Sequence, residues 1–189
     1  MGAQDSKLFV ISGPSGAGKG TLVTRVRERR SNLGLTVSAT TRAPRKGEVD
    51  GVNYFFLTRE EFDRRVANDE FVEWAEVHGN CYGTLVSEVQ SKLASGASLI
   101  LEIDVQGALQ VKERFPEAVL IFIKPPSLEV LRERLVGRGT ESPETIELRM
   151  ANAAHELALA DRYDDVVVND DLDRATDELV RVLDMHERI

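Results

Sequence analysis

The sequence predicts an α/β fold with a three-layer core around a parallel sheet, and three observations support this prediction. A short apolar run at residues 8–11 stops at a glycine-rich stretch and is followed by a helical pattern of apolar residues. Two later runs, residues 99–103 and 118–123, are almost continuously apolar, which is typical of strands covered on both faces. Strand and helix patterns alternate at both ends of the chain, which favours one parallel sheet.

The first half of the chain contains an initial strand and helix, followed by short strands around a polar loop. Thr58 and Glu61 have the spacing of a capping box that opens a helix with Phe62 on its inner side. The elements expected here are a strand at 7–12, a helix at 20–30, a strand at 35–39, a loop at 40–51, a strand at 54–57, a helix from 59, a strand at 71–77, a turn at 79–83 and a helix at 86–93.

The second half alternates more regularly between buried strands and amphipathic helices. Ser142 followed by Pro143 is a strong helix start, because the serine can cap the helix and proline fits its first turn. The elements expected here are a strand at 99–104, a helix at 106–115, a strand at 119–123, a helix at 128–135, a helix from 143 to 160, a strand at 166–168 and a helix at 172–183.

We expect a single domain with two insertions. The short strands of residues 35–93 predict a mixed, β-rich lobe, and residues 137–157 predict a helical lid. The core then consists of about residues 7–34, 94–136 and 158–189.

Composition limits the classes of protein to which the chain can belong. Its 189 residues, 42% of them hydrophobic, suffice for one such domain. The net charge of −8 disfavours nonspecific binding to nucleic acid. No run approaches the roughly 20 apolar residues of a membrane span, and the first residues form no secretory signal. The one cysteine, Cys81, excludes an internal disulfide, so we expect a cytoplasmic protein without a membrane partner.

The glycine-rich stretch has the pattern of a phosphate-binding loop, or P-loop. Gly13, Gly18 and Lys19 meet the spacing G-x-x-x-x-G-K between a strand and a helix. The glycines let successive N–H groups point at one anion, the helix dipole adds positive potential, and the lysine supplies a mobile charge. An ordinary turn would not require the glycines and the lysine together. We expect nucleotide phosphates to bind at Gly13, Pro14, Ser15, Gly16, Ala17, Gly18, Lys19, Gly20 and Thr21.

Two further groups of residues have patterns that suit a nucleotide site. Arg42 and Arg45 lie three apart in a proline-bounded loop, which fits either a solvated charge run or a phosphate clamp. Asp104 ends a buried strand next to the P-loop, where an acid can hold metal-bound water, and Glu102 is expected on its face. Strict alternation would put Glu73 and Phe71 on one face of their strand.

Several motifs in order resemble guanylate kinase over nearly the whole chain. The motifs are residues 13–16 (GPSG), 38–45 (SATTRAPR), Gly83, 102–107 (EIDVQG), 137–141 (GRGTE) and 168–172 (VNDDL). The resemblance implies phosphoryl transfer from ATP to GMP with Mg²⁺, in a core, nucleotide-binding lobe and lid. It also implies that Lys19, Arg138 and Arg149 are catalytic, and that Asn169 lies on the adenine side. The GMP site that it implies comprises Ser38, Arg42, Arg45, Tyr54, Glu73, Tyr82, Thr84, Glu102 and Asp104, with Asp104 also reaching the metal through water.

Two alternatives and one departure accompany this resemblance. A noncatalytic guanylate-kinase-like module that binds phosphopeptides would use the same clamp, but it would not need Lys19, Arg138 and Arg149. An adenylate kinase would not need Glu73. The departure is Gly20, where most P-loop enzymes have Ser or Thr. The oligomeric state is left open by the sequence.

Overall fold

The main sheet has five parallel strands. The computed structural model describes residues 6–77, 79–137, 139 and 142–187. The strand order is β2-β7-β1-β8-β9, and every neighbouring pair is parallel. The strands are β1 (Leu8–Ser12), β2 (Gly34–Leu35), β7 (Leu99–Glu102), β8 (Val119–Lys124) and β9 (Asp165–Val168). This confirms the predicted parallel core and puts the strand that precedes the P-loop at its centre.

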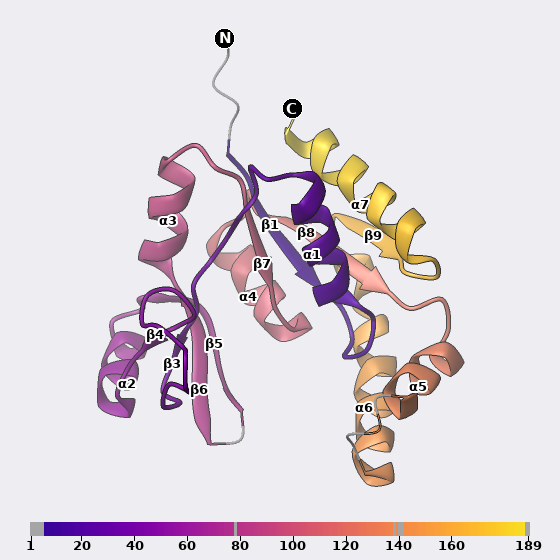
Figure 1. The fold of residues 1–189 in the computed structure, drawn as a ribbon, viewed down its shortest axis with the longest axis horizontal. Helices are drawn as coiled ribbons and strands as arrows, with labels where there is room; N and C mark the ends of the chain where they lie inside the picture. The colour runs from indigo at the N-terminus through magenta and orange to yellow at the C-terminus, as the bar shows by residue number, and fades with distance from the viewer. Residues whose placement is uncertain (1–5, 78, 138, 140–141, 188–189) are drawn as a thin grey trace.

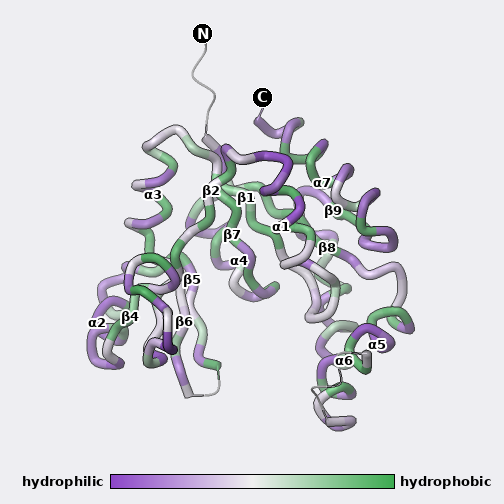
Figure 2. The backbone as a smooth tube through the Cα atoms, viewed as in Figure 1, coloured by the Kyte–Doolittle hydropathy of each residue, from purple (hydrophilic) through white to green (hydrophobic). Residues whose placement is uncertain are grey.

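Helices cover both faces of this sheet, as Figure 1 shows. Alternation along β1 sends Phe9 and Ile11 to one face and Leu8 and Val10 to the other, and all four are buried. The first face packs against α1 (Lys19–Arg29) and α7 (Leu172–Glu187). The second packs against α3 (Val86–Ala94) and α4 (Val105–Arg114). Figure 2 shows the result as green central strands between helices that are purple on their outer sides.

A second, smaller sheet forms the predicted β-rich lobe. Its order is β4-β3-β6-β5, with β3 parallel to β4 and the other pairs antiparallel. Its elements are β3 (Ala39–Thr40), β4 (Phe55–Phe56), α2 (Arg59–Ala67), β5 (Phe71–Val77) and β6 (Asn80–Leu85). Phe62 of α2 stacks on Phe71 at 4.3 Å and anchors a separate apolar cluster. The Thr58 hydroxyl accepts from the Glu61 N–H, which confirms the predicted cap.

Two packed helices follow β8, and the second of them lies in the region expected to be a lid, residues 137–157. They are α5 (Leu128–Gly137) and α6 (Pro143–Leu157), followed by the 3₁₀ turn η1 (Ala160–Arg162). The Ser142 side chain caps α6, as predicted. Leu131, Leu135 and Ala153 form a small buried cluster between α5 and α6. In Figure 1 this pair and the small sheet project from the same end of the main sheet, away from the termini.

Two local predictions were wrong. The strand expected at 35–39 is two strands, because Leu35 pairs with the main sheet and Ala39 with the small one. The turn expected over 79–83 is mostly strand β6. Gly83 was expected to be a turn residue, but it lies within the strand. Glycine is needed there for close packing, because a Cβ would lie 2.7 Å from the Phe71 ring. Among the helices described, none is long and apolar enough to cross a membrane.

Candidate active site

The P-loop follows the central strand β1 and leads into α1. Gly13, Gly16 and Gly18 have φ values of 141°, 89° and 92°, in the region that favours glycine. A Cβ on Gly13 would lie 2.2 Å from the Ile123 carbonyl oxygen, so the loop also requires glycine there for space. Gly18 caps α1 without any side-chain hydrogen bond, which leaves the first N–H groups of the helix to an anion.

Lys19 is the first residue of α1 and lies over this loop. Its Nζ donates to the carbonyl oxygens of Gly13 at 2.6 Å and Pro14 at 3.1 Å. The ammonium group is therefore held at the rim of the curved backbone that phosphates would occupy. A positive charge at this place, together with the dipole of α1, makes the loop suitable for a polyanion.

The helical pair and the segment after β9 meet the P-loop from the other side. The Arg149 guanidinium on α6 donates to the Ser15 hydroxyl. Asn169 donates its amide to the Ala17 carbonyl at 2.8 Å, and Arg134 donates to the Asn169 carbonyl at 2.8 Å. These contacts bring Arg149 and Asn169 to the loop, as expected. Arg138 lies outside the described residues.

An open hollow of about 500 Å³ adjoins this part of the loop. Gly16, Gly18, Thr21, Arg134, Asn169 and Leu172 line it. A nucleobase bound here would extend from phosphates held on the loop. Arg134 was not assigned a role from the sequence, because nothing in its own helix pattern reveals that it reaches two segments distant in sequence.

The two acids expected at the end of the buried strand occupy different environments: Glu102 is the last residue of β7, and Asp104 lies beyond the strand. Asp104 caps α4, with its Oδ1 accepting from the Gly107 N–H at 2.7 Å. Glu102 faces the first turn of α1, where a Cβ on Gly20 would lie 3.5 Å from its Oε1. Burial raises the pKa of Glu102, and the charge of Lys19 opposes this rise. The described residues include no cluster of three or more metal-ligating side chains, so protein groups alone do not form a metal cage there.

A second group of predicted residues gathers on the small sheet. The Arg42 guanidinium lies over the Tyr54 ring, with its carbon 5.4 Å from the ring centroid, and Tyr54 meets Tyr82 edge-on at 6.3 Å. Glu48 binds Arg42, and this hydrogen bond is the main reason that the pKa of Arg42 is raised. Glu48 was missed in the sequence, where it is one charge in a polar loop.

Glu73 is a carboxylate on β5, an edge strand of this sheet. The Thr84 hydroxyl donates to its Oε1 at 2.8 Å, and a Cβ on Gly107 would lie 3.5 Å from its Oε2. Burial raises the pKa of Glu73, and the nearby Asp104 carboxylate adds to the rise. Ser38 lies on the neighbouring segment, where its carbonyl accepts from the Phe55 N–H.

The face predicted for Glu73 was wrong, because a β-bulge interrupts the alternation. Phe71 pairs with Leu85 and Glu73 with the next residue, Thr84, so two steps on β5 oppose one on β6. Phe71 packs in the cluster of the small sheet, while Val72 packs with α4 in the main core. Glu73 follows Val72 toward α4 and so reaches Gly107.

A carboxylate that the sequence did not single out, Glu156, lies near Lys19 and Asp104. It is at the end of α6 and half-buried. Burial raises its pKa, the charge of Lys19 lowers it, and Asp104 raises it further. The carboxylate at the end of α6 is therefore close enough to Lys19 and Asp104 for their charges to affect it.

Comparison with known proteins agrees with this geometry. A family model described as guanylate kinase matches residues 5–186. A guanylate kinase from Gloeobacter violaceus is 57% identical over 178 residues, which cover 94% of this chain and 87% of the relative. One from Halalkalibacterium halodurans is 51% identical over 183 residues, covering 97% and 90%. The crystal structure of guanylate kinase from Anaplasma phagocytophilum has a TM-score of 0.72 at 37% identity, covering 96% of this chain and 86% of that one. The chain belongs to the guanylate kinase family.

Proposed function

We propose that this protein transfers the γ-phosphoryl group of ATP to GMP, and to dGMP, giving ADP and GDP. The observation that carries this proposal is the pairing of Glu73 with Thr84 beside the arginine-bearing loop. A carboxylate can accept from both the N1–H and the 2-amino group of guanine, whereas adenine presents an acceptor at N1. The small sheet thus offers a guanine-reading group and a phosphate-binding group on one lobe.

On the acceptor side, the lobe of residues 35–93 binds GMP. Glu73, helped by the Ser38 and Thr84 hydroxyls, receives the base. Four side chains of the lobe form the phosphate clamp, and two acids complete the site toward the ATP side. The clamp consists of Arg42, Arg45, Tyr54 and Tyr82, and the acids are Glu102 and Asp104.

On the donor side, the P-loop binds ATP. The backbone of residues 13–21 holds the phosphates, and Asn169 lies beside the adenine. Lys19 and Arg149 meet the charge that develops on the transferring group, and Arg138 is proposed for the same task from the sequence alone. Since the GMP phosphate oxygen attacks phosphorus directly, the protein's contribution is alignment and charge neutralisation.

Mg²⁺ accompanies ATP in this proposal, and the donor set fits it. Mg²⁺ retains several waters and needs only one or two carboxylates, so the absence of a three-ligand cluster among the described residues is no obstacle. Asp104 would hold a metal-bound water, because its second oxygen accepts no hydrogen bond from the described residues. When bound, Mg²⁺ neutralises phosphate charge.

The proposed reaction uses three parts of the chain: the core, the GMP lobe of residues 35–93 and the lid. The core is about residues 7–34, 94–136 and 158–189, and residues 137–157 form the lid. Closure of the lid and the GMP lobe would exclude water, so that ATP is not simply hydrolysed. The protein acts on small molecules in the cytoplasm, with neither nucleic acid nor membrane as a partner.

One assay tests the proposal against the two alternatives. ADP formation is measured with ATP, Mg²⁺ and each of GMP, AMP, UMP and CMP. We expect turnover with GMP that exceeds the other acceptors by orders of magnitude. Comparable turnover with AMP would indicate an adenylate kinase, and no turnover together with GMP binding would indicate a noncatalytic module.

A further inference from the structure

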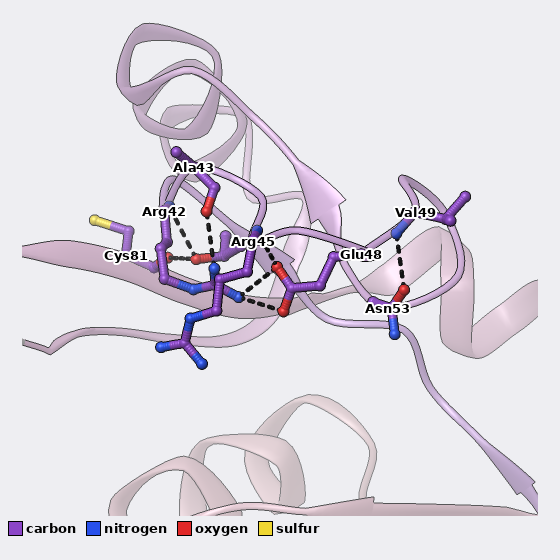
Figure 3. Close-up of polar contacts among 8 residues, drawn as sticks. Arg42, Ala43, Arg45, Glu48, Val49, Asn53 and Cys81 are labelled. Carbon is purple, nitrogen blue, oxygen red and sulfur yellow. Dashed lines mark hydrogen bonds and ion pairs between the residues drawn. The ribbon is translucent and has the colours of Figure 1, made fainter.

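Glu48 is an acidic residue in the loop that carries Arg42 and Arg45. The Arg42 Nη2 donates to both of its carboxylate oxygens, at 2.9 and 3.1 Å, and the Arg42 Nη1 donates to the Ala43 carbonyl at 2.8 Å. Figure 3 shows the guanidinium held between these two acceptors. Three hydrogen bonds thus fix the orientation of a side chain that would otherwise have many rotamers.

Glu48 is itself fixed by the main chain of the loop. The Arg45 N–H donates to its Oε2 at 2.6 Å, and the Glu48 N–H donates back to the Arg45 carbonyl at 3.0 Å. The turn between them contains Gly47 with a φ of 91°. The carboxylate is therefore anchored to the backbone and would not leave when a ligand arrives.

The pair is also shielded from water. The Arg42 and Glu48 side chains are 15% and 19% exposed, far less than the surface ion pairs of α2, such as Arg59 with Asp63 at 55% and 56%. The Arg42 hydrogen bond, followed by that of the Arg45 N–H, lowers the pKa of Glu48, so the carboxylate is ionised at neutral pH. Glu48 is therefore an ionised, partly buried carboxylate, fixed by Arg42 and by the Arg45 N–H, that can hold the Arg42 guanidinium in one orientation.

The second arginine differs from the first. In Figure 3 the Arg45 guanidinium points away from Glu48, and it makes no hydrogen bond or ion pair with the described residues. Arg42 has five N–H donors in a rigid fork, and the contacts with Glu48 and Ala43 leave part of it for a ligand. The described residues thus hold one arginine of the clamp in place before a ligand binds and do not hold the other.

We infer that Glu48 is a positioning residue that holds Arg42, and the Arg45 main chain, in the arrangement that receives the GMP phosphate. This rests on the proposed role of Arg42 and Arg45 as the clamp. Its physical basis is preorganisation, because a long side chain ordered before binding costs less when the ligand arrives. A simple charge argument predicts the opposite sign, since removing an anion next to Arg42 would strengthen its attraction for phosphate.

Steady-state kinetics of Glu48→Gln show whether KM for GMP rises, as positioning predicts, or falls, as the charge argument predicts. We expect KM for GMP to rise about tenfold, or ~1.4 kcal/mol, with kcat within about threefold and KM for ATP unchanged. Guanosine, which lacks the phosphate, should inhibit wild type and variant with the same Ki. Glu48→Asp keeps the charge but is one methylene shorter, so it should lie between wild type and Glu48→Gln.

Controls separate positioning from its alternatives. Glu60→Gln removes an exposed carboxylate from the same lobe and should change nothing. In an Arg42→Met background, Glu48→Gln should lose most of its effect on KM for GMP, because it acts largely through Arg42.

Three outcomes would overturn the inference. The first is a KM for GMP that is unchanged or lower in Glu48→Gln although Arg42→Met raises it. This result would support Arg42 as part of the clamp but would show that Glu48 does not position it. The second is weaker guanosine binding with a lower Tm, which would indicate a merely structural role. The third is an Arg42→Met variant with normal KM for GMP, which would refute the clamp assignment itself.

Discussion

Replacing Glu73 by glutamine tests the proposed reading of guanine. The glutamine side chain keeps one acceptor but turns the other position into a donor, which would face a donor of the base. Hydrogen bonds to charged groups contribute about 1.5–3 kcal/mol, so KM for GMP should rise about 10- to 150-fold. Thr84 can still donate to the remaining amide oxygen, so the sheet itself should be preserved.

The ratio between acceptors is the sharper measurement. In wild type, AMP would leave the desolvated Glu73 carboxylate opposite an acceptor, and sites built on hydrogen bonds reject such analogues by about 10⁴-fold. Glu73→Gln should narrow the difference between GMP and AMP in kcat/KM, measured by coupled ADP formation. The control is Glu76→Gln, on the same strand but exposed, which should change neither value. Equal use of AMP and GMP by wild type would refute the assignment.

Stability without ligand gives an independent readout of the same group. Burial raises the pKa of Glu73 above its ordinary value of 4.5, so the folded protein binds this proton more tightly than the unfolded chain. The carboxylate therefore lowers stability at pH values above its folded pKa, and this cost disappears as the pH falls below 4.5. Glu73→Gln should have the higher Tm near neutral pH, and the difference should shrink toward pH 4.5. A lower Tm at neutral pH would contradict the argument.

Four further substitutions test the ATP side. Lys19→Ala should lower kcat at least about a hundredfold while GMP binding, measured by calorimetry, survives; near-normal turnover would mean that the loop is not catalytic. Arg149→Ala should lower kcat by about two to four decades with smaller effects on KM, since its charge is needed mainly during transfer; a pure KM effect would make it a ground-state binder. Asp104→Asn can retain the cap on α4 and should weaken the apparent Mg²⁺ dependence, and an unchanged Mg²⁺ titration would contradict its role. Gly20→Ser should leave activity within about tenfold, and a larger loss would show that the site requires glycine.

Local signals in the sequence predicted those parts of the fold that short segments determine by themselves. The caps at Thr58 and Ser142 were correct because each hydroxyl and the N–H group that donates to it lie three residues apart. The P-loop was recognisable because the spacing of Gly13, Gly18 and Lys19 is a property of one short segment. Each of these features forms within a few residues and needs no information from the rest of the chain.

The features that sequence reasoning missed depend on contacts between distant segments. The bulge between Phe71 and Glu73 turns Glu73 to the side of Val72, and it is defined by pairing with another strand, which the order of residues does not show. The contact of Arg149 with Ser15 joins residues 134 positions apart, so only the family resemblance pointed to it. Glu48 is six residues from Arg42, and its role requires the turn that brings its carboxylate back.

Gly20 stands where most P-loop enzymes have Ser or Thr, and the surrounding structure tolerates this difference. Gly20 lies in α1 with no positive φ, and a Cβ there would make an ordinary contact with Glu102, so neither backbone strain nor lack of space requires glycine. Thr21, one residue further along the helix, is turned by about 100° and borders the hollow that Arg134 and Asn169 also line. In the proposed site, waters oriented by Asp104 would take the place of a hydroxyl ligand to Mg²⁺. A structure with ATP and Mg²⁺ in which Thr21 binds the metal directly would refute this account.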